Sequence, residues 1–157
     1  MKGMFALIAA LLLAVGTGPA LAADQAPAAA AKPAAAKKAK TAAKKTKVVI
    51  QVSNPDPRSW AQALNYTENL QEVMGKDNVE IEVVALGQGI GVLKLDSPHA
   101  TRVAEALGRG IRIQACEITM RRQKLTRDDM LSDIGYVPAG LGQIIKRQSE
   151  GWHYISG

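Results

Sequence analysis

Short β-branched runs alternate with apolar residues at helical spacing along the second part of this 157-residue chain. Residues 47–52 form a β-branched run of strand length, which polar residues and prolines stop at 54–57. Asp56, followed by a proline, is typical of a helix start. Apolar side chains then recur at helical spacing up to Met74, and Gly75 marks the end of the predicted helix.

The same alternation continues to the end of the chain. Further strands are predicted at residues 79–86, 111–115, 134–138 and 152–155. Further helices are predicted at residues 97–107, 117–124 and 139–149, with a short helix or turn at 126–129. Strands that alternate with helices belong to the α/β class and imply a mostly parallel sheet covered by helices on both faces.

The first 22 residues have the pattern of a secretory signal peptide. Lys2 provides a basic start, residues 4–15 form an apolar run, and Ala20-Leu21-Ala22 is a small-x-small cleavage signature. The apolar run is shorter than the roughly 20 residues that a membrane-spanning helix needs. We therefore expect a cleaved signal peptide at residues 1–22 and a mature protein in the periplasm.

The segment from residue 23 to residue 46 consists almost entirely of Ala, Lys and Pro. It has too few large apolar side chains to offset the entropy of ordering, so we expect a disordered linker. Such a lysine-rich tail is either a solvated spacer or a weak contact to anionic polymers of the cell envelope. Each nearby cation would contribute roughly 1 kcal/mol to that contact.

The positive charge of the chain lies outside the predicted domain. The whole chain carries +6, to which Lys2 contributes +1, while seven lysines in residues 32–47 against Asp24 contribute +6. Residues 48–157 are left with −1, which argues against a nucleic-acid partner. The length suits one α/β domain at residues 47–157. A single cysteine excludes a disulfide within the chain and a cysteine-based zinc site, and we expect no metal and no cofactor.

That cysteine, Cys116, follows directly on the predicted strand at 111–115 and precedes a helical segment. Ligands of an open parallel sheet bind outside the carboxyl ends of the strands. The segments expected to meet there are residues 53–56, 87–91, 116–117 and 138–140. A helix N-terminus and the cations Arg121, Arg122 or Lys124 would lower the pKa of the thiol. The alternative is a packing residue, since free cysteines are among the most buried side chains.

The residues expected to contact a substrate come from the same segments. They are Asn54, Asp56, Gly87, Gly89, Gly91 and Arg121. Backbone amides of residues 87–91 would stabilise a bound anion together with the nearby cations. The glycine spacing fits neither the dinucleotide fingerprint nor the Walker pattern, so a tight turn or close packing against a neighbouring subunit is the alternative. Neither His99 nor His153 can be paired with the cysteine from spacing alone.

Four segments of the domain resemble the DsrE/DsrF family, sulfur-relay-type α/β proteins related to the YchN-like group. The segments are residues 48–60, 79–89, 110–120 and 137–155. The most specific piece is the strand that ends in Cys116-x-x-Thr119-Met120. The resemblance implies a three-layer α/β/α domain with a five-stranded sheet, and homo-oligomers that are commonly trimers or hexamers.

The resemblance also implies a function. In sulfur-relay members of the family, a cysteine after the third strand carries a persulfide and passes sulfur between proteins, and Cys116 falls at that position. We therefore expect a periplasmic, homo-oligomeric sulfur-handling protein with a thiol-bearing acceptor protein as a partner. It would be a sulfurtransferase or a sulfur carrier. The alternative is a non-catalytic oligomeric binding or scaffold module in which Cys116 is a buried structural residue.

Overall fold

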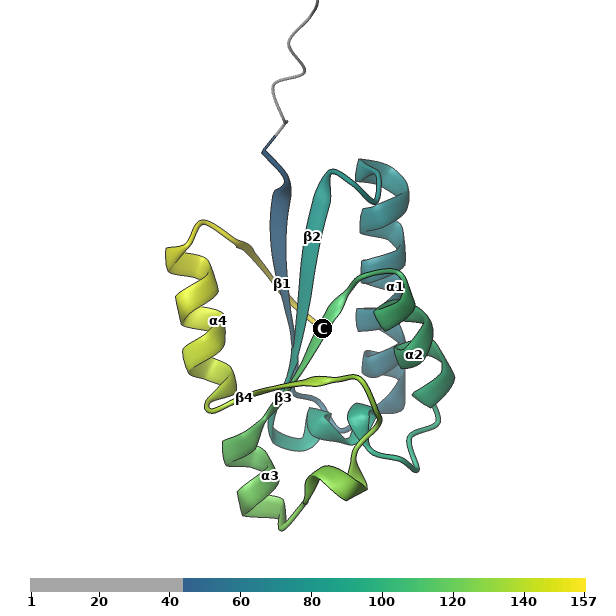
Figure 1. Ribbon diagram of the computed structural model, residues 1–157, viewed down its shortest axis with the longest axis vertical. Coiled ribbons are helices and arrows are strands. Elements are labelled where there is room, and N and C mark those ends of the chain that lie inside the picture. Colours follow the sequence, from purple (N-terminus) through teal and green to yellow (C-terminus); the bar gives the residue numbers. More distant parts are fainter. Residues whose placement is uncertain (1–43) are drawn as a thin grey trace, which may run out of the picture. The chain divides into compact units, whose positions relative to one another are not determined.

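The computed structural model describes residues 44–157, which form a five-stranded sheet with helices packed against it (Figure 1). Along the chain the elements are β1 (Thr46–Val52), α1 (Pro57–Met74), β2 (Val79–Ala85), η1 (Gly87–Leu93), α2 (Ala100–Gly108), β3 (Arg112–Cys116), α3 (Glu117–Gln123), η2 (Arg127–Asp129), β4 (Gly135–Val137), α4 (Gly140–Ser149) and β5 (His153–Ser156), where η denotes a 3-10 helix. The predicted signal peptide and most of the predicted linker lie outside the described residues. No helix within residues 44–157 has the length and apolar character needed to cross a bilayer.

All five strands are parallel, in the spatial order β4-β3-β2-β1-β5. The predicted α/β class and the five-stranded sheet are therefore confirmed, and the sheet is parallel throughout. The strands β1 to β4 are added in one direction, and β5 then returns to the far side of β1. The strand order reverses between β1 and β5, whereas β3, which ends in Cys116, lies two strands away from that reversal.

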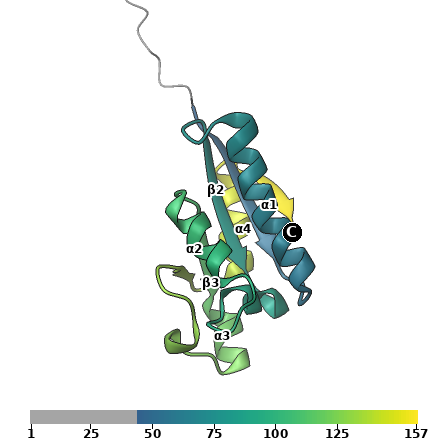
Figure 2. The same cartoon turned by 90° about the vertical axis from the view of Figure 1, so that its right-hand side faces the viewer.

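The two faces of the sheet are covered by different helices (Figures 1 and 2). Helices α1 and α2 pack on one face, over a large apolar core that contains Ile50, Val83 and Ile113. Helix α4 covers the other face, where the apolar cluster is small. The buried members of that small cluster are Val49, Val84, Val137, Ile144 and Trp152. The predicted three-layer α/β/α arrangement is confirmed.

Helix α1 begins where its predicted N-cap residue places it, whereas α2 begins later than predicted. Asp56 caps α1 as predicted, because its Oδ1 accepts the N–H of Arg58 at 3.0 Å. The helix expected to open at Ser97 begins instead at Ala100. Ser97 Oγ accepts the N–H of His99 at 3.2 Å, so its hydroxyl stabilises a turn before the helix rather than the helix itself.

The glycine-rich segment after β2 opens with the predicted tight turn, in which the amide of Gly89 donates to the carbonyl oxygen of Leu86 at 3.1 Å and Gly87 has a φ of +55°, and it forms the first part of the 3-10 helix η1. A Cβ added at Gly89 would lie 2.4 Å from the carbonyl oxygen of Val52, at the end of β1. A Cβ added at Gly91 would lie 2.7 Å from the ring of Trp60. These two glycines therefore allow close packing, which takes place within this chain.

Candidate functional site

The candidate site lies at the carboxyl end of β3, close to the first residues of α3 and α4 (Figure 1). Cys116 is the last residue of β3, its side chain is buried, and its Sγ accepts the N–H of Gly140 at 3.1 Å. A Cβ added at Gly140 would lie 3.1 Å from the Cβ of Cys116 and 3.2 Å from that of Leu86. The absence of a side chain at Gly140 thus lets α4 begin against the thiol, and the expected meeting of residues 138–140 with Cys116 is observed.

Cys116 lines a cavity of about 270 Å³. The other lining residues come from the end of β2, from α3 and from the start of α4: Leu86, Gly87, Ile118, Thr119, Arg122, Ala139, Gly140 and Leu141. This volume is slightly below the roughly 300–1,000 Å³ of pockets for drug-sized ligands. The cavity therefore suits a small group bound next to the sulfur.

The pKa of the Cys116 thiol is lowered although the side chain is buried. Burial is the largest single influence and raises the pKa, because it disfavours the thiolate. Polar hydrogens near the sulfur outweigh it, those of the Thr119 hydroxyl and of the backbone amides of Gly140, Thr119 and Ile118, and of these the Gly140 amide makes a hydrogen bond to Sγ. The polar groups around the sulfur therefore stabilise the thiolate by more than burial disfavours it.

This cause agrees with the predicted helix N-terminus, because Ile118 and Thr119 lie in the first turn of α3, but not with the predicted cations. We expected Arg121, Arg122 or Lys124 to lower the thiol pKa, but none of them is among the groups that shift it. Arg122 lines the cavity of the thiol, whereas Arg121 lines a separate cavity together with Glu117 and Arg127. Glu117 Oε1 lies 3.4 Å from Nη2 of Arg127. This carboxylate is therefore paired with an arginine rather than with the thiol.

Thr119 lines the cavity of the thiol and is hydrogen-bonded to the segment that follows β2, a role that the sequence did not predict. Its side chain is 7% exposed, and its Oγ1 accepts the N–H of Gly87 at 3.0 Å. Gln123 donates from Nε2 to the carbonyl oxygen of Gly87 at 2.9 Å. Helix α3 therefore binds both backbone polar groups of Gly87. The signal for Thr119 was its spacing, since residues three apart at the start of a helix lie on the same side.

Among the residues predicted to contact substrate, Gly87 shares the cavity with the thiol, and the others do not line it. Asn54 Oδ1 accepts the N–H of Asp56 at 2.8 Å, and both residues belong to the loop that leads into α1. Gly89 and Gly91 pack against β1 and Trp60 as described above. Of the six predicted residues, the structure thus places only Gly87 in the cavity of the sulfur. The substrate contacts of all six remain predictions.

Fewer backbone amides of residues 87–91 are free to bind an anion than the sequence predicted. The amide of Gly87 donates to the Thr119 hydroxyl. The amide of Gly89 donates to the carbonyl oxygens of Ser53 and Leu86, both at 3.1 Å. Both amides are used within the chain, so the anion-stabilising donor observed at the sulfur comes from α4 instead.

A buried carboxylate on the same face of the sheet was missed by the sequence analysis. Glu82 in β2 is fully buried and accepts hydrogen bonds from Arg147 at 2.6 Å, Arg112 at 3.1 Å and Gln143 at 2.6 Å. Burial raises its pKa, but hydrogen bonds from Arg147 and Gln143 and the charges of Arg147 and Arg112 bring the pKa below its usual value. Because Arg147 and Gln143 belong to α4, Glu82 holds the helix whose first residue contacts Cys116.

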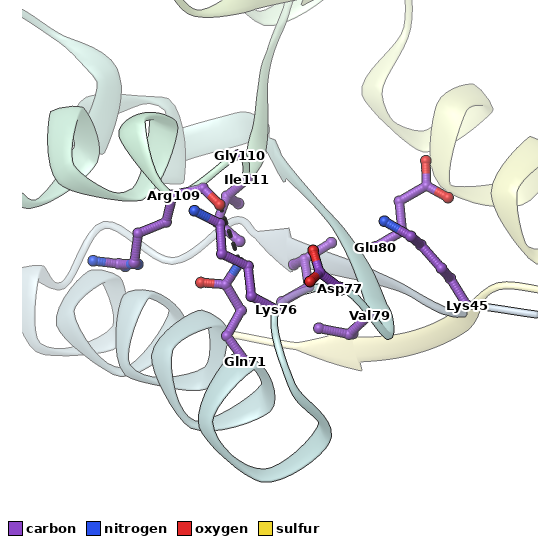
Figure 3. Close-up of a pocket in the computed structure, with 10 residues that line it drawn as sticks. Lys45, Gln71, Lys76, Asp77, Val79, Glu80, Arg109, Gly110 and Ile111 are labelled. Atoms are coloured by element: carbon purple, nitrogen blue, oxygen red, sulfur yellow. Dashed lines mark hydrogen bonds between the residues drawn. The ribbon is translucent and has the colours of Figure 1, made fainter. Parts of the chain in front are cut away.

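A second cavity, of about 430 Å³, lies at the opposite end of the sheet, where β2 and β3 begin (Figure 3). Lys45, Lys76 and Arg109 line it together with two carboxylates, and Gln71 Nε2 donates to the carbonyl oxygen of Arg109 at 3.2 Å. Its charges are mixed, and no cysteine, serine, threonine or histidine lines it. The cavity of Cys116 is therefore the better candidate for nucleophilic chemistry.

Neither histidine lines the cavity of the thiol. His99 Nε2 lies 2.9 Å from the carbonyl oxygen of Pro57, and His153 is exposed on β5. Within residues 44–157, no group of three or more histidine, cysteine or carboxylate side chains is gathered as potential metal ligands. Among the described residues, the Cys116 thiol thus has a backbone amide as hydrogen-bond partner and no histidine in its cavity.

Comparisons with known proteins agree with this fold. The model of the DsrE/DsrF-like family matches residues 20–156. A protein of unknown function from Methanobacterium thermoautotrophicum is 34% identical, with a TM-score of 0.69, over 72% of this chain and 100% of that chain. A conserved protein of unknown function from Bacteroides thetaiotaomicron is 17% identical, with a TM-score of 0.58, over 71% and 94% of the two chains. The YchN protein of E. coli is 9% identical, with a TM-score of 0.58, over 73% and 99%. No curated protein sequence is detectably similar to the chain.

Proposed function

Because the chain belongs to the DsrE/DsrF-like family, whose members commonly take part in sulfur relay, we propose that Cys116 carries sulfane sulfur as a persulfide. The observation that supports the proposal is a thiol of lowered pKa beside a small cavity at the carboxyl end of the sheet. The thiolate is the nucleophilic form of cysteine, and a lowered pKa increases its population near neutral pH.

The proposed reaction consists of two nucleophilic displacements without net oxidation. The Cys116 thiolate attacks the outer sulfur of a donor such as polysulfide or thiosulfate. A bond forms between Sγ and that sulfur, the bond to the rest of the donor breaks, and its electron pair leaves with the shortened polysulfide or with sulfite. A thiolate of an acceptor protein then attacks the outer sulfur of the persulfide, and Cys116 departs as a thiolate.

We further propose that the working form is a homotrimer or homohexamer in the periplasm. The signal pattern at residues 1–22 supports export, and the lysine-rich linker supports a weak additional contact with envelope polymers. Leu141 and Ile145 lie one turn apart on α4 and are 59% and 67% exposed, which supports contact with a second chain. Light scattering of the mature protein tests the assembly, and a monomer mass at micromolar concentration would contradict it.

Mass spectrometry after exposure to polysulfide tests the central proposal. We expect the native protein to gain the mass of sulfur at Cys116 and to lose it again when a small thiol is added. The Cys116→Ser variant, which keeps the side-chain shape but has no thiol, should gain nothing. The proposal is wrong if native Cys116 reacts with an alkylating reagent but takes up no sulfur.

A non-catalytic oligomeric scaffold is the second candidate. It is favoured by the burial of Cys116, which is 4% exposed, and by its close packing against Gly140. It predicts that native Cys116 is alkylated far more slowly than the same residue in urea. It also predicts that Cys116→Ser loses stability without loss of any sulfur-dependent activity.

A further inference from the structure

The cavity of Cys116 carries a single formal charge, and that charge is positive. Among the described residues that line it, Arg122 is the one charged side chain, and the others are apolar apart from Thr119 and the thiol. Glu117, which follows the cysteine directly, lines a separate cavity and is paired with Arg127. A negatively charged molecule that enters the cavity of the thiol therefore meets a cation and no carboxylate.

The guanidinium group of Arg122 is available to such a molecule. Arg122 is exposed, and within residues 44–157 no carboxylate is paired with it. Arg112 and Arg147, by contrast, are both bound by Glu82. Arg122 lies in the last turn of α3, where a cation also stabilises the helix end. That stabilisation does not depend on the charge of a ligand, so the two roles can be separated by experiment.

We propose that Arg122 binds the negative end of the sulfur donor, which makes small inorganic anions such as thiosulfate the preferred donors. This role deepens the proposed function and rests on it. A guanidinium donates two parallel hydrogen bonds to a carboxylate or a phosphate, and the oxygens of a sulfonate group accept them in the same way. The cavity volume of about 270 Å³ suits an anion of this size. The Cys116 thiolate then forms a bond to the sulfane sulfur, the S–S bond of thiosulfate breaks, and sulfite leaves with its electron pair.

A cation at this position matters because the nucleophile is itself an anion. Two like unit charges 4 Å apart in water repel each other enough to slow their approach about fivefold. The charge of Arg122 offsets this repulsion for an anionic reactant and has no such effect on a neutral one. Apolar cavity walls strengthen the attraction, and salt weakens it. The sequence favoured Arg121 for the substrate contact, but Arg121 lines the separate cavity with Glu117 and Arg127.

The experiment compares the rates at which iodoacetate and iodoacetamide alkylate Cys116 in the native, full-length protein at low ionic strength. The two reagents react at the same carbon and have nearly the same size, but only iodoacetate is charged. Arg122→Gln should lower the ratio of the iodoacetate rate to the iodoacetamide rate about fivefold, and Arg122→Lys should keep most of it. Lys124→Gln is the matched control, because it removes the same charge from a residue outside the cavity of the thiol. Its ratio should equal that of the wild type, and any change in helix stability or thiol ionisation cancels in the ratio.

An unchanged ratio in Arg122→Gln, or an equal fall in Lys124→Gln, would overturn the proposal, as would a fall in Arg121→Gln alone. If native Cys116 is too buried to be alkylated, calorimetry of thiosulfate binding to Cys116→Ser decides instead. Binding that Arg122→Gln weakens about fivefold in this background supports the proposal. Binding that Arg122→Gln leaves unchanged, or no binding, overturns it.

Sulfur uptake by the wild type from thiosulfate and from polysulfide is measured in parallel by mass spectrometry. Uptake without an effect of Arg122→Gln on the ratio rejects the role of Arg122 alone. A lowered ratio without uptake from either donor rejects the proposed function alone.

Discussion

The two faces of the sheet are stabilised by different kinds of interaction. Ile50 and Val49 are neighbours in β1 and are both fully buried, but Ile50 belongs to the large core under α1 and α2 and Val49 to the small cluster under α4. In β2, Val83 lies in the large core, while the adjacent Glu82 is buried under α4. Apolar burial is non-directional, whereas a buried carboxylate needs partners at defined positions. The first face therefore contributes mainly stability, and the second also fixes geometry.

Helix α4 shows what the directional interactions achieve. Near its carboxyl end, Arg147 is hydrogen-bonded to Glu82, and at its first residue the amide of Gly140 donates to Cys116. The apolar cluster beneath this helix is small. We infer that the polar contacts hold α4 in register with the thiol, and variants on the two faces can separate this role from simple stabilisation.

The largest effect is expected from removal of the buried carboxylate. Glu82→Ala leaves Arg147 and Arg112 without their shared partner, which should lower the free energy of unfolding by about 3–5 kcal/mol. Urea denaturation measures this loss. Glu150→Ala is the control, because Glu150 is 37% exposed and its pair with Arg147 should contribute only about 0–1 kcal/mol. Equal losses in the two variants would show that α4 does not depend on Glu82.

A variant of the apolar face tests whether stability and thiol chemistry can be separated. Ile50→Ala creates a cavity under α1 and should lower the free energy of unfolding by about 2–5 kcal/mol. The alkylation rate of Cys116 under native conditions should stay at the wild-type value, because the side chain of Ile50 packs in the core cluster on the face opposite to α4. Glu82→Ala should change both quantities. If the alkylation rate instead followed the free energy of unfolding in both variants, the proposed separation of stability from thiol geometry between the two faces would be wrong.

A smaller effect is expected where α4 begins. Gly140→Ala places a Cβ 3.1 Å from the Cβ of Cys116, so the helix must move and the free energy of unfolding should fall by about 1–3 kcal/mol. The alkylation of Cys116 should slow as its amide donor is displaced. Gly142→Ala is the matched control, because its Cβ would make an ordinary 3.5 Å contact with Ala139. Alanine at this helical position should be neutral or stabilise by about 0.5–1 kcal/mol.

The contrast between the faces also explains which features the sequence could reveal. The strands and helices were predictable because their signals are local, such as the β-branched run of β1 and the cap at Asp56. The place of Cys116 followed from the rule that parallel strands end at one edge. The partners of Glu82 could not be found in this way. In β2 it alternates with apolar residues as a solvent-facing residue would, and Arg147 comes 65 residues later.

The same limit applies to the thiol. Arg121, Arg122 and Lys124 follow Cys116 closely in the sequence, but none of these cations is among the groups that shift its pKa. The donors that matter include Gly140, which is 24 residues away and reaches the sulfur only because the fold returns α4 to this edge. The neighbouring residues Ile118 and Thr119 also lower the pKa, so local sequence accounts for the position of the thiol and for part of its environment, and the long-range contact adds the donor from α4.

The last and most specific prediction concerns acid. The pKa of Glu82 lies below its usual value in the folded protein, because its hydrogen bonds and the charges of Arg147 and Arg112 outweigh the effect of burial. The unfolded chain, where a glutamate has a pKa of about 4.3, therefore binds the proton more readily than the folded protein. The stabilisation is complete above this unfolded pKa and is lost as the pH falls through the folded pKa.

Urea denaturation of the wild type between about pH 7 and pH 3 should therefore show a fall in unfolding free energy that is shallower in Glu82→Gln. Asp129→Asn is the control on the exposed surface. Hydrogen bonds from the backbone and side chain of Thr126 also lower the pKa of Asp129. Replacing the Asp129 carboxylate should therefore also make the fall of unfolding free energy with pH shallower. Because solvent screens Asp129, the change should be smaller than for Glu82→Gln. Parallel curves for the wild type and Glu82→Gln would mean that the ionised carboxylate does not hold α4, and the polar face would then owe its geometry to the apolar cluster alone.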